Sequence, residues 1–265
     1  MRRSTFFQVG QAVYATYLRR LLVETSTLDS LYNYYDAVVE AYGVDTVLVR
    51  DDTLRTAYGW GFRLSYADLV DARRNLISGV HAYYPDYYQE AALEAQDVDS
   101  VVIYGNRVEA NTVRGIIVRG SGSLVAAIDS NVVADDTAFA GIQVHRPATV
   151  TRNLITRNTN GIYVADNGGT SVINNNNIEA NVTYGLWNVT ATAVNAQSNW
   201  WNDVAGPRCA LSPSLVTGCA GSTGDFVYGY LGNVDYSSVL PARAAGAPTA
   251  GPPMSTATAS REGRP

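Results

Sequence analysis

Five residues with aromatic or hydrogen-bonding side chains follow glycines at two fixed offsets. Gln143, Tyr163 and Trp187 lie two residues after a Gly, and Arg119 and His145 lie four residues after one. Flat aromatic rings beside hydrogen-bonding groups suit a sugar chain, whose rings offer apolar faces and hydroxyl edges. These five residues form the predicted glycan-binding surface. In the alternative interpretation, Tyr163 and Trp187 only cover the protein surface, and Arg119 and His145 are solvated.

The acidic residues give no positive case for catalysis. Hydrolysis of a glycosidic bond needs two carboxyl groups facing each other across that bond, and no two acids fall at equivalent positions of neighbouring repeats. Asp135 falls beside Arg157, which predicts a surface ion pair. His81 and His145 each lack a second histidine close enough in the sequence to form a metal site. The sequence predicts no catalytic residue, no metal ligand and no cofactor.

An internal repeat must position these residues. An asparagine recurs within a short segment of mainly apolar residues. A second Asn or Asp follows five residues later, and a Gly and another apolar residue come after it. Successive copies are offset by 25, 22, 23 and 23 residues, a length that fits three short strands joined by turns. The first position of the repeat is Asn106, Asn131, Asn153, Asn176 and Asn199, and the second is Asn111, Asp136, Asn158 and Asn181.

Apolar and polar residues alternate within each copy, as in the segments 116–119 and 162–165. This alternation is typical of strands with one buried face. A single repeat cannot bury that face alone, so neighbouring copies must stack and close a core between them. The sequence therefore predicts an all-β fold, a solenoid of parallel strands.

The repeat resembles the right-handed parallel β-helices of the pectin lyase-like superfamily, in which stacked turn asparagines form hydrogen-bonded ladders. The resemblance covers residues 101–201 and assigns the first Asn of each copy to such a ladder. It ends in Asn199-Trp200-Trp201-Asn202, which is similar to the Asn-Trp-Trp-Gly segment closing many secreted bacterial β-helices, with Asn202 in place of the usual Gly. Fainter copies upstream, with Asp52 and Asn75 at the ladder position, bring the expected solenoid to about seven coils.

Four segments are expected around this solenoid. Apolar residues at three-to-four spacing predict a helical N-terminal cap over residues 1–43, with two diverged coils as the alternative. The β-helix spans 44–205, and helix formers predict a short helical insertion near 85–96. Residues 206–240 form a C-terminal cap loop and the last strands. Residues 241–265 are rich in Ala, Pro and Gly, which predicts a disordered tail.

The two cysteines, Cys209 and Cys219, lie ten residues apart beyond the last coil. Their spacing predicts a disulfide, and hence an oxidising compartment, with two free thiols as the alternative. An extracellular or cell-surface location is expected, although residues 1–8 show no apolar segment of a secretion signal. The chain of 265 residues carries a formal net charge of −5 and no evident basic patch, so nucleic acid is not an expected partner.

Two classes of function remain open, with a third behind them. The favoured class is an extracellular, non-catalytic β-helix that binds a polysaccharide or a cell-surface glycan, or serves as an adhesion unit. The second is a polysaccharide lyase or glycoside hydrolase with a divergent site, assembled with the Tyr-rich insertion near 81–88. The third is a purely structural unit of a surface assembly or filament. No run of apolar residues is long enough for a membrane span, and the sequence does not indicate the oligomeric state.

Overall fold

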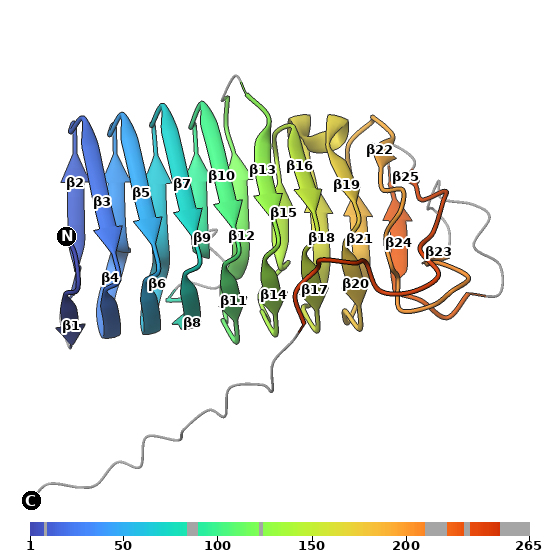
Figure 1. Ribbon diagram of the computed structural model, residues 1–265, viewed down its shortest axis with the longest axis horizontal. Coiled ribbons are helices and arrows are strands. Elements are labelled where there is room, and N and C mark those ends of the chain that lie inside the picture. Colours follow the sequence, from blue (N-terminus) through green and yellow to red (C-terminus); the bar gives the residue numbers. More distant parts are fainter. Residues whose placement is uncertain (8–9, 84–89, 122–123, 210–221, 231–233, 250–265) are drawn as a thin grey trace, which may run out of the picture.

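The computed structural model describes residues 1–7, 10–83, 90–121, 124–209, 222–230 and 234–249. The chain winds into a parallel β-helix whose strands lie side by side along the long axis of the molecule (Figure 1). Every pair of neighbouring strands in the described part is parallel, and equivalent residues of successive coils lie in register except for one shift between β4 and β6. The predicted all-β solenoid of about seven coils is confirmed.

Three faces make up each coil. We call face A the strands that precede the first ladder residue, face B the short strands between the two ladder residues, and face C the strands after the second. β4 (Thr27–Tyr42) and β6 (Thr53–Ser65) run through faces B and C without a break, which joins these two faces into one sheet.

Face A is a nine-stranded sheet. Its strands are β3 (Arg20–Glu24), β5 (Thr46–Arg50), β7 (Leu69–Arg73), β10 (Ser100–Tyr104), β13 (Ala126–Asp129), β16 (Ala148–Thr151), β19 (Val172–Asn174), β22 (Val194–Asn195) and β25 (Val234–Asp235). Face B holds β1 (Thr5–Phe7), β8 (Leu76–His81), β11 (Arg107–Glu109), β14 (Val132–Ala134), β17 (Leu154–Thr156) and β20 (Asn177–Glu179). Face C holds β2 (Val13–Thr16), β9 (Ala91–Gln96), β12 (Arg114–Arg119), β15 (Ile142–Val144), β18 (Asn160–Val164), β21 (Tyr184–Asn188), β24 (Phe226–Gly229) and β23 (Arg208–Cys209).

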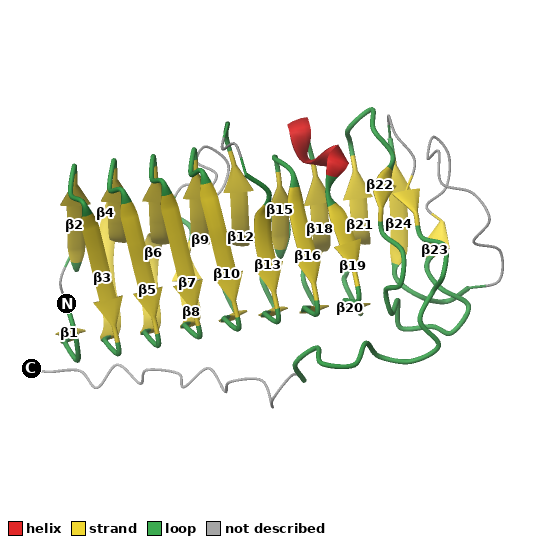
Figure 2. Ribbon diagram, turned by 45° about the horizontal axis from the view of Figure 1, so that its top comes forward, coloured by secondary structure: helices red, strands yellow, loops and turns green. Residues whose placement is uncertain are grey.

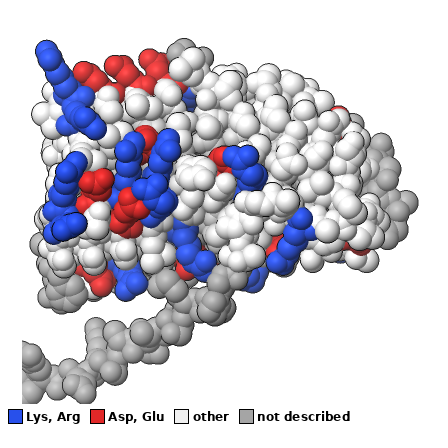
Figure 3. Space-filling model, viewed as in Figure 1, with Lys and Arg blue, Asp and Glu red and all other residues white. Residues whose placement is uncertain are grey.

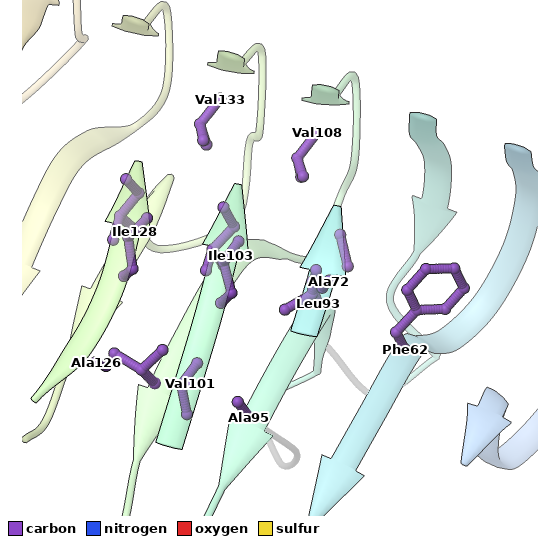
Figure 4. Close-up of a cluster of buried hydrophobic side chains, with 14 of the residues drawn as sticks. Phe62, Ala72, Leu93, Ala95, Val101, Ile103, Val108, Ala126, Ile128 and Val133 are labelled. Atoms are coloured by element: carbon purple, nitrogen blue, oxygen red, sulfur yellow. The ribbon is translucent and has the colours of Figure 1, made fainter. Parts of the chain in front are cut away.

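The core lies inside the three faces. Equivalent side chains stack between coils: Ile103 lies beside Ile128 on face A, and Val108 beside Val133 on face B (Figure 4). On face C, Leu93 stacks in the same way between Phe62 and Ile116 and, like the other four, is fully buried. Because each coil buries its apolar side chains against the other faces of the same coil and against the neighbouring coils, the core is one continuous column of stacked residues.

The first ladder runs through buried asparagines in the turns between faces A and B. In each rung, the backbone N–H and the side-chain Nδ2 of one Asn donate to the Oδ1 of the next, at 2.8 and 2.9 Å between Asn131 and Asn153. The Nδ2 of Asn153 also donates to the Ile128 carbonyl of the preceding coil, at 2.9 Å. The same pattern joins Asn75, Asn106, Asn131, Asn153, Asn176 and Asn199. Asp52 continues the ladder by accepting from the Ser26 N–H and donating its own N–H to Asn75.

A second ladder runs along the turns between faces B and C. It joins Asn111, Asp136, Asn158, Asn181 and Asp225. A residue with positive φ precedes each of its first four members: Ala110, Asp135, Arg157 and Ala180. This left-handed residue turns the chain sharply and lets the following side chain point into the coil.

The helical cap predicted for residues 1–43 is wrong. These residues form strands β1 to β4, and the only helix in the described part is the 3₁₀ turn η1 (Asp166–Thr170), drawn red in Figure 2. Corners interrupt the two-residue alternation of a strand and produce the apparent helical spacing: Val13 lies on face C, Tyr17 at a corner and Leu21 on face A. Pairing with β6 along β4 then determines the structure.

The helix predicted near 85–96 is also wrong over its described residues. Residues 91–96 form β9, which pairs with β6 and β12 on either side. The segment Ala91-Ala-Leu-Glu-Ala consists of helix formers, but two neighbouring strands satisfy its backbone groups and so override that propensity. Residues 84–89 lie outside the described residues, and so does most of the Tyr-rich insertion.

The C-terminal segment differs in part from the predicted disordered tail of 241–265. Residues 241–249 return along the solenoid across β20 (Figure 1), where the Ala244 N–H donates to Asn177 Oδ1 at 2.7 Å. Arg243 binds both carboxylate oxygens of Glu179. Residues 250–265 lie outside the described residues. Asn202, which replaces the expected Gly, adopts a φ of 66°, a left-handed conformation that asparagine tolerates better than most residues.

Candidate functional site

One outward row of side chains follows face C through the whole solenoid. Strand register places each member directly beside the next. The row reads Glu40, Arg63, Glu94, Ile117, Gln143, Tyr163, Trp187 and Tyr228, and a second row beside it includes Gln96, Arg119 and His145. We call these two rows the face C strip. Its character changes from charged through polar to aromatic along the axis.

The aromatic end contains half-buried rings in mutual contact. The Tyr163 and Trp187 ring centroids lie 5.2 Å apart, with the ring planes at 72°. Phe139 packs against both, at 4.7 Å from Tyr163 and 5.5 Å from Trp187. Tyr184 stacks on Tyr228 at 5.2 Å, nearly parallel. Such a continuous aromatic surface offers several ring faces against which an apolar face of a ligand can pack.

The polar middle is organised around His145. Its Nδ1 lies 2.7 Å from Asp166 Oδ2, and its Nε2 lies 3.2 Å from Gln143 Oε1. The His145 ring also makes an edge contact with Tyr163, at 5.9 Å between centroids. Burial raises the pKa of the Tyr163 hydroxyl, and the Asp166 carboxylate adds to that shift. These contacts fix the imidazole next to the aromatic end, with Asp166 on its solvent side.

The charged end surrounds a carboxyl group that the sequence analysis missed. Glu94 is fully buried although it points away from the core, and it forms ion pairs with Arg63 and Arg119. Burial raises the pKa of the Glu94 carboxyl, and the two guanidinium groups oppose that shift. Arg63 also lies over the Trp60 ring, 4.8 Å from its centroid, and 3.6 Å from Glu40.

Glu94 was missed because the insertion conceals the register of its coil. Because residues 91–96 were predicted to be helical, they were not matched to the strand positions of the other coils. The alternation Leu93-Glu94-Ala95 is equivalent to Ile116-Ile117-Val118, and this match is the signal that could have found it.

The structure brings the five predicted site residues together on face C. Gln143, His145, Tyr163 and Trp187 are neighbours on three successive strands, whereas Arg119 turns toward Glu94. Gln143 is only 2 % exposed, so its side chain supports the surface more than it presents a hydrogen-bonding group to solvent. The predicted ion pair between Asp135 and Arg157 is confirmed, at 2.6 Å.

The other predicted sites lie elsewhere. The asparagines of the first ladder are buried in the turns between faces A and B, remote from face C. Cys209 lies in β23 at the C-terminal end, but Cys219 lies outside the described residues. Within the described ranges, no group of three or more His, Cys, Asp or Glu side chains is arranged to hold a metal ion.

Charged residues on face A alternate in sign over the N-terminal half, and the C-terminal half of this side carries few charges (Figure 3). Asp71 accepts from both Arg50 and Arg73, and Arg74 forms a bidentate pair with Asp51. These pairs neutralise much of the positive charge of the arginines at short range. In the part of the chain that the structure describes, no helix has the length and hydropathy of a membrane span.

Comparison with known proteins identifies one match. A family model described as the right handed beta helix region matches residues 30–201, well over half of the chain. No curated protein and no solved structure matches the sequence.

Proposed function

The chain belongs to the right-handed β-helix family, and on that premise we propose that it is an extracellular module whose face C strip binds a glycan. One observation carries this proposal: four aromatic rings on adjacent strands form a continuous surface that leads directly into the His145 hydrogen-bonding group. Sugar rings combine an apolar face with hydroxyl edges, and the aromatic and polar parts of the strip are complementary to these two features.

Charge on the strip favours a neutral glycan. Arg119 and Arg63 already neutralise Glu94, and Glu40 lies against Arg63 on its other side. An anionic sugar would have to compete with a buried carboxylate for both guanidinium groups, and success would leave that carboxylate buried without its compensating charge. Binding through ring stacking and hydroxyl hydrogen bonds avoids this cost.

Replacing Trp187 with alanine is expected to weaken glycan binding severalfold. Stacking of a sugar ring on this side chain contributes about 1 kcal/mol through apolar burial and ring geometry. Binding to a glycan array, followed by calorimetric titration of the hits, provides the measurement. Tyr104→Ala is the matched control, because Tyr104 is an exposed aromatic residue on face A. If Trp187→Ala and the parent bind the glycan with equal affinity, the aromatic end is not part of the binding site.

Salt concentration provides a test of the ligand's charge. A neutral glycan should bind almost equally at low and high salt, whereas an acidic polysaccharide should bind more weakly as salt screens its attraction to arginine. A steep salt dependence would therefore overturn the preference for a neutral ligand while leaving the aromatic surface intact. A protein that binds no glycan at all would instead be assigned the purely structural role.

A carbohydrate-active enzyme is the second candidate. The buried Glu94 favours it, because burial raises the pKa of this carboxyl and general acids of this kind have raised pKa values. Glu40 lies two coils away from Glu94, on the other side of Arg63. Release of new reducing ends from the glycans that bind, lost in Glu94→Gln, would support a lyase or hydrolase. Absence of release from every bound glycan supports the binding module.

The extracellular location is tested by the cysteines. We expect Cys209 and Cys219 to form a disulfide, which would close a short loop and stabilise the protein by about 2–3 kcal/mol. Intact mass after alkylation without reductant should show no label, and two labels after reduction. Two labelled thiols in protein purified without reductant would contradict both the disulfide and the argument for an oxidising compartment.

A further inference from the structure

The second ladder contains a carboxyl group where its geometry calls for an amide. Asp136 is completely buried, and its Oδ1 accepts from the Asn111 N–H at 3.2 Å and from Asn111 Nδ2 at 2.7 Å. Its Oδ2 is buried as well and has no hydrogen-bond partner. A buried oxygen without a donor is unusual in a ladder whose other polar groups are satisfied.

Comparison with the next coils shows what belongs at the Oδ2 position. In Asn158 the corresponding atom is Nδ2, which donates to the Val133 carbonyl at 3.0 Å and to Asn181 Oδ1 at 3.2 Å. In Asn181 it again is Nδ2, and it donates to the Ile155 carbonyl at 3.1 Å. In both of these coils this position therefore faces hydrogen-bond acceptors.

The repeat glycines confirm that these atoms are equivalent. A Cβ built on Gly115 would lie 2.5 Å from Asp136 Oδ2, and one built on Gly141 would lie 2.8 Å from Asn158 Nδ2. A Cβ on Gly161 would lie 2.9 Å from Asn181 Nδ2. The Oδ2 atom of Asp136 thus occupies the place of a donor nitrogen.

We propose that Asp136 carries a proton on Oδ2 in the folded protein and donates it within the ladder, so that the solenoid is strengthened by acid. An ionised carboxylate would direct a charged oxygen at acceptors, whereas the carboxylic acid reproduces the donor of asparagine. Burial raises the pKa of Asp136 well above its ordinary value, in agreement with the geometry.

The surrounding charges act in the same direction. Asp135 and Glu109 both favour the neutral form of Asp136, although each is paired with an arginine, Arg157 and Arg107 respectively. Two further ladder carboxyls also have raised pKa values because of burial: Asp52, at about 6, and Asp225. One oxygen of Asp225 accepts both donors of Asn181, as Asp136 Oδ1 does for Asn111, and Asp225 is the last member of the described ladder.

The sign of the pH dependence follows from linkage. A carboxyl whose folded pKa is raised gives its full stabilisation below the unfolded pKa, near 4, and loses it as pH rises through the folded pKa. For Asp52 this window extends from about 4 to about 6, and for Asp136 it extends from near 4 up to its own raised pKa. The native protein should therefore melt at a lower temperature at pH 8 than at pH 5.

The experiment compares melting temperatures between pH 5 and pH 8 for the native chain, Asp136→Asn and the exposed control Asp68→Asn. At pH 8, Asp136→Asn should melt a few degrees higher than the native chain, and its melting temperature should fall much less between pH 5 and pH 8. The melting temperature of Asp68→Asn should follow that of the native chain. Infrared spectroscopy at pH 7 should show a protonated carboxyl band that Asp136→Asn lacks. Asp136→Asn with unchanged or lower stability at pH 8, or a spectrum without that band, overturns the proposal.

Discussion

Replacing Gly161 with alanine should destabilise the solenoid by roughly 3 kcal/mol or more, among the largest effects of any single methyl group in this chain. A Cβ at this position would lie 2.5 Å from the Gly185 carbonyl oxygen and 2.9 Å from Asn181 Nδ2. Neither atom can retreat, because one belongs to the backbone of the next coil and the other to the second ladder. We expect a lower midpoint in urea unfolding, or insoluble protein on expression.

The control for Gly161→Ala is a glycine whose role is conformational. Gly105 has a φ of 65° and precedes the ladder residue Asn106, and a Cβ built on it would meet only Arg74 Cγ, at an ordinary contact distance of 3.6 Å. The equivalent residues Arg74, Ser130 and Asn175 adopt the same left-handed conformation with full side chains. Gly105→Asn should therefore remain near native stability. Similar losses in Gly161→Ala and Gly105→Asn would show that close packing of the repeat glycines is not the cause.

Replacing Asn153 with alanine should cost roughly 2–4 kcal/mol. The change leaves the buried Asn131 backbone N–H without its acceptor, and such an unsatisfied group costs about 1–3 kcal/mol. It also removes one acceptor of Asn131 Nδ2, which keeps its bonds to the Ile103 and Asp129 carbonyls. It also leaves the Ile128 carbonyl without its side-chain donor. The free energy of unfolding in urea provides the measurement, with the exposed Thr183→Ala as the control, expected within about 0.5 kcal/mol of the parent.

Asn153→Gln separates the geometric from the chemical requirement of the ladder. Glutamine keeps the amide but places it one methylene further from the backbone, where the turn leaves no room between rungs that lie about 4.8 Å apart. We expect it to be no better than alanine. A stability of Asn153→Ala equal to that of Thr183→Ala would show that the ladder contributes nothing to the fold.

The solenoid could be predicted from the sequence because most coils have the same residue types at the same positions of the repeat. Asn131, Asn153 and Asn176 occupy the positions that the offsets predicted, and so do the second-ladder residues Asp136 and Asn158. Row neighbours such as Tyr163 and Trp187 followed from the same offsets. Because the coils stack, residues at equivalent positions of neighbouring repeats lie in contact. The repeat length alone therefore predicts many tertiary contacts of this fold.

Prediction failed where the period was interrupted. The N-terminal coils have no Asn at the ladder position, so the spacing of Val13, Tyr17 and Leu21 was interpreted as helical instead of as a strand, a corner and a strand. Glu94 was hidden by an insertion of unequal length. Its burial also depends on the side chains that lie against it on face C, Arg63 and Arg119, and the repeat spacing does not predict how these side chains are oriented.

The spacing of the ladder rungs along the chain has a consequence for protein engineering. Successive rungs are separated by 31, 25, 22, 23 and 23 residues, yet the hydrogen bonds between them remain between 2.8 and 3.0 Å. The scaffold thus tolerates loop grafts at a corner without a change in its own geometry. A designer could lengthen the segment after His81, where β8 ends, to carry new recognition loops, with a spacing between neighbouring grafts set by the backbone itself.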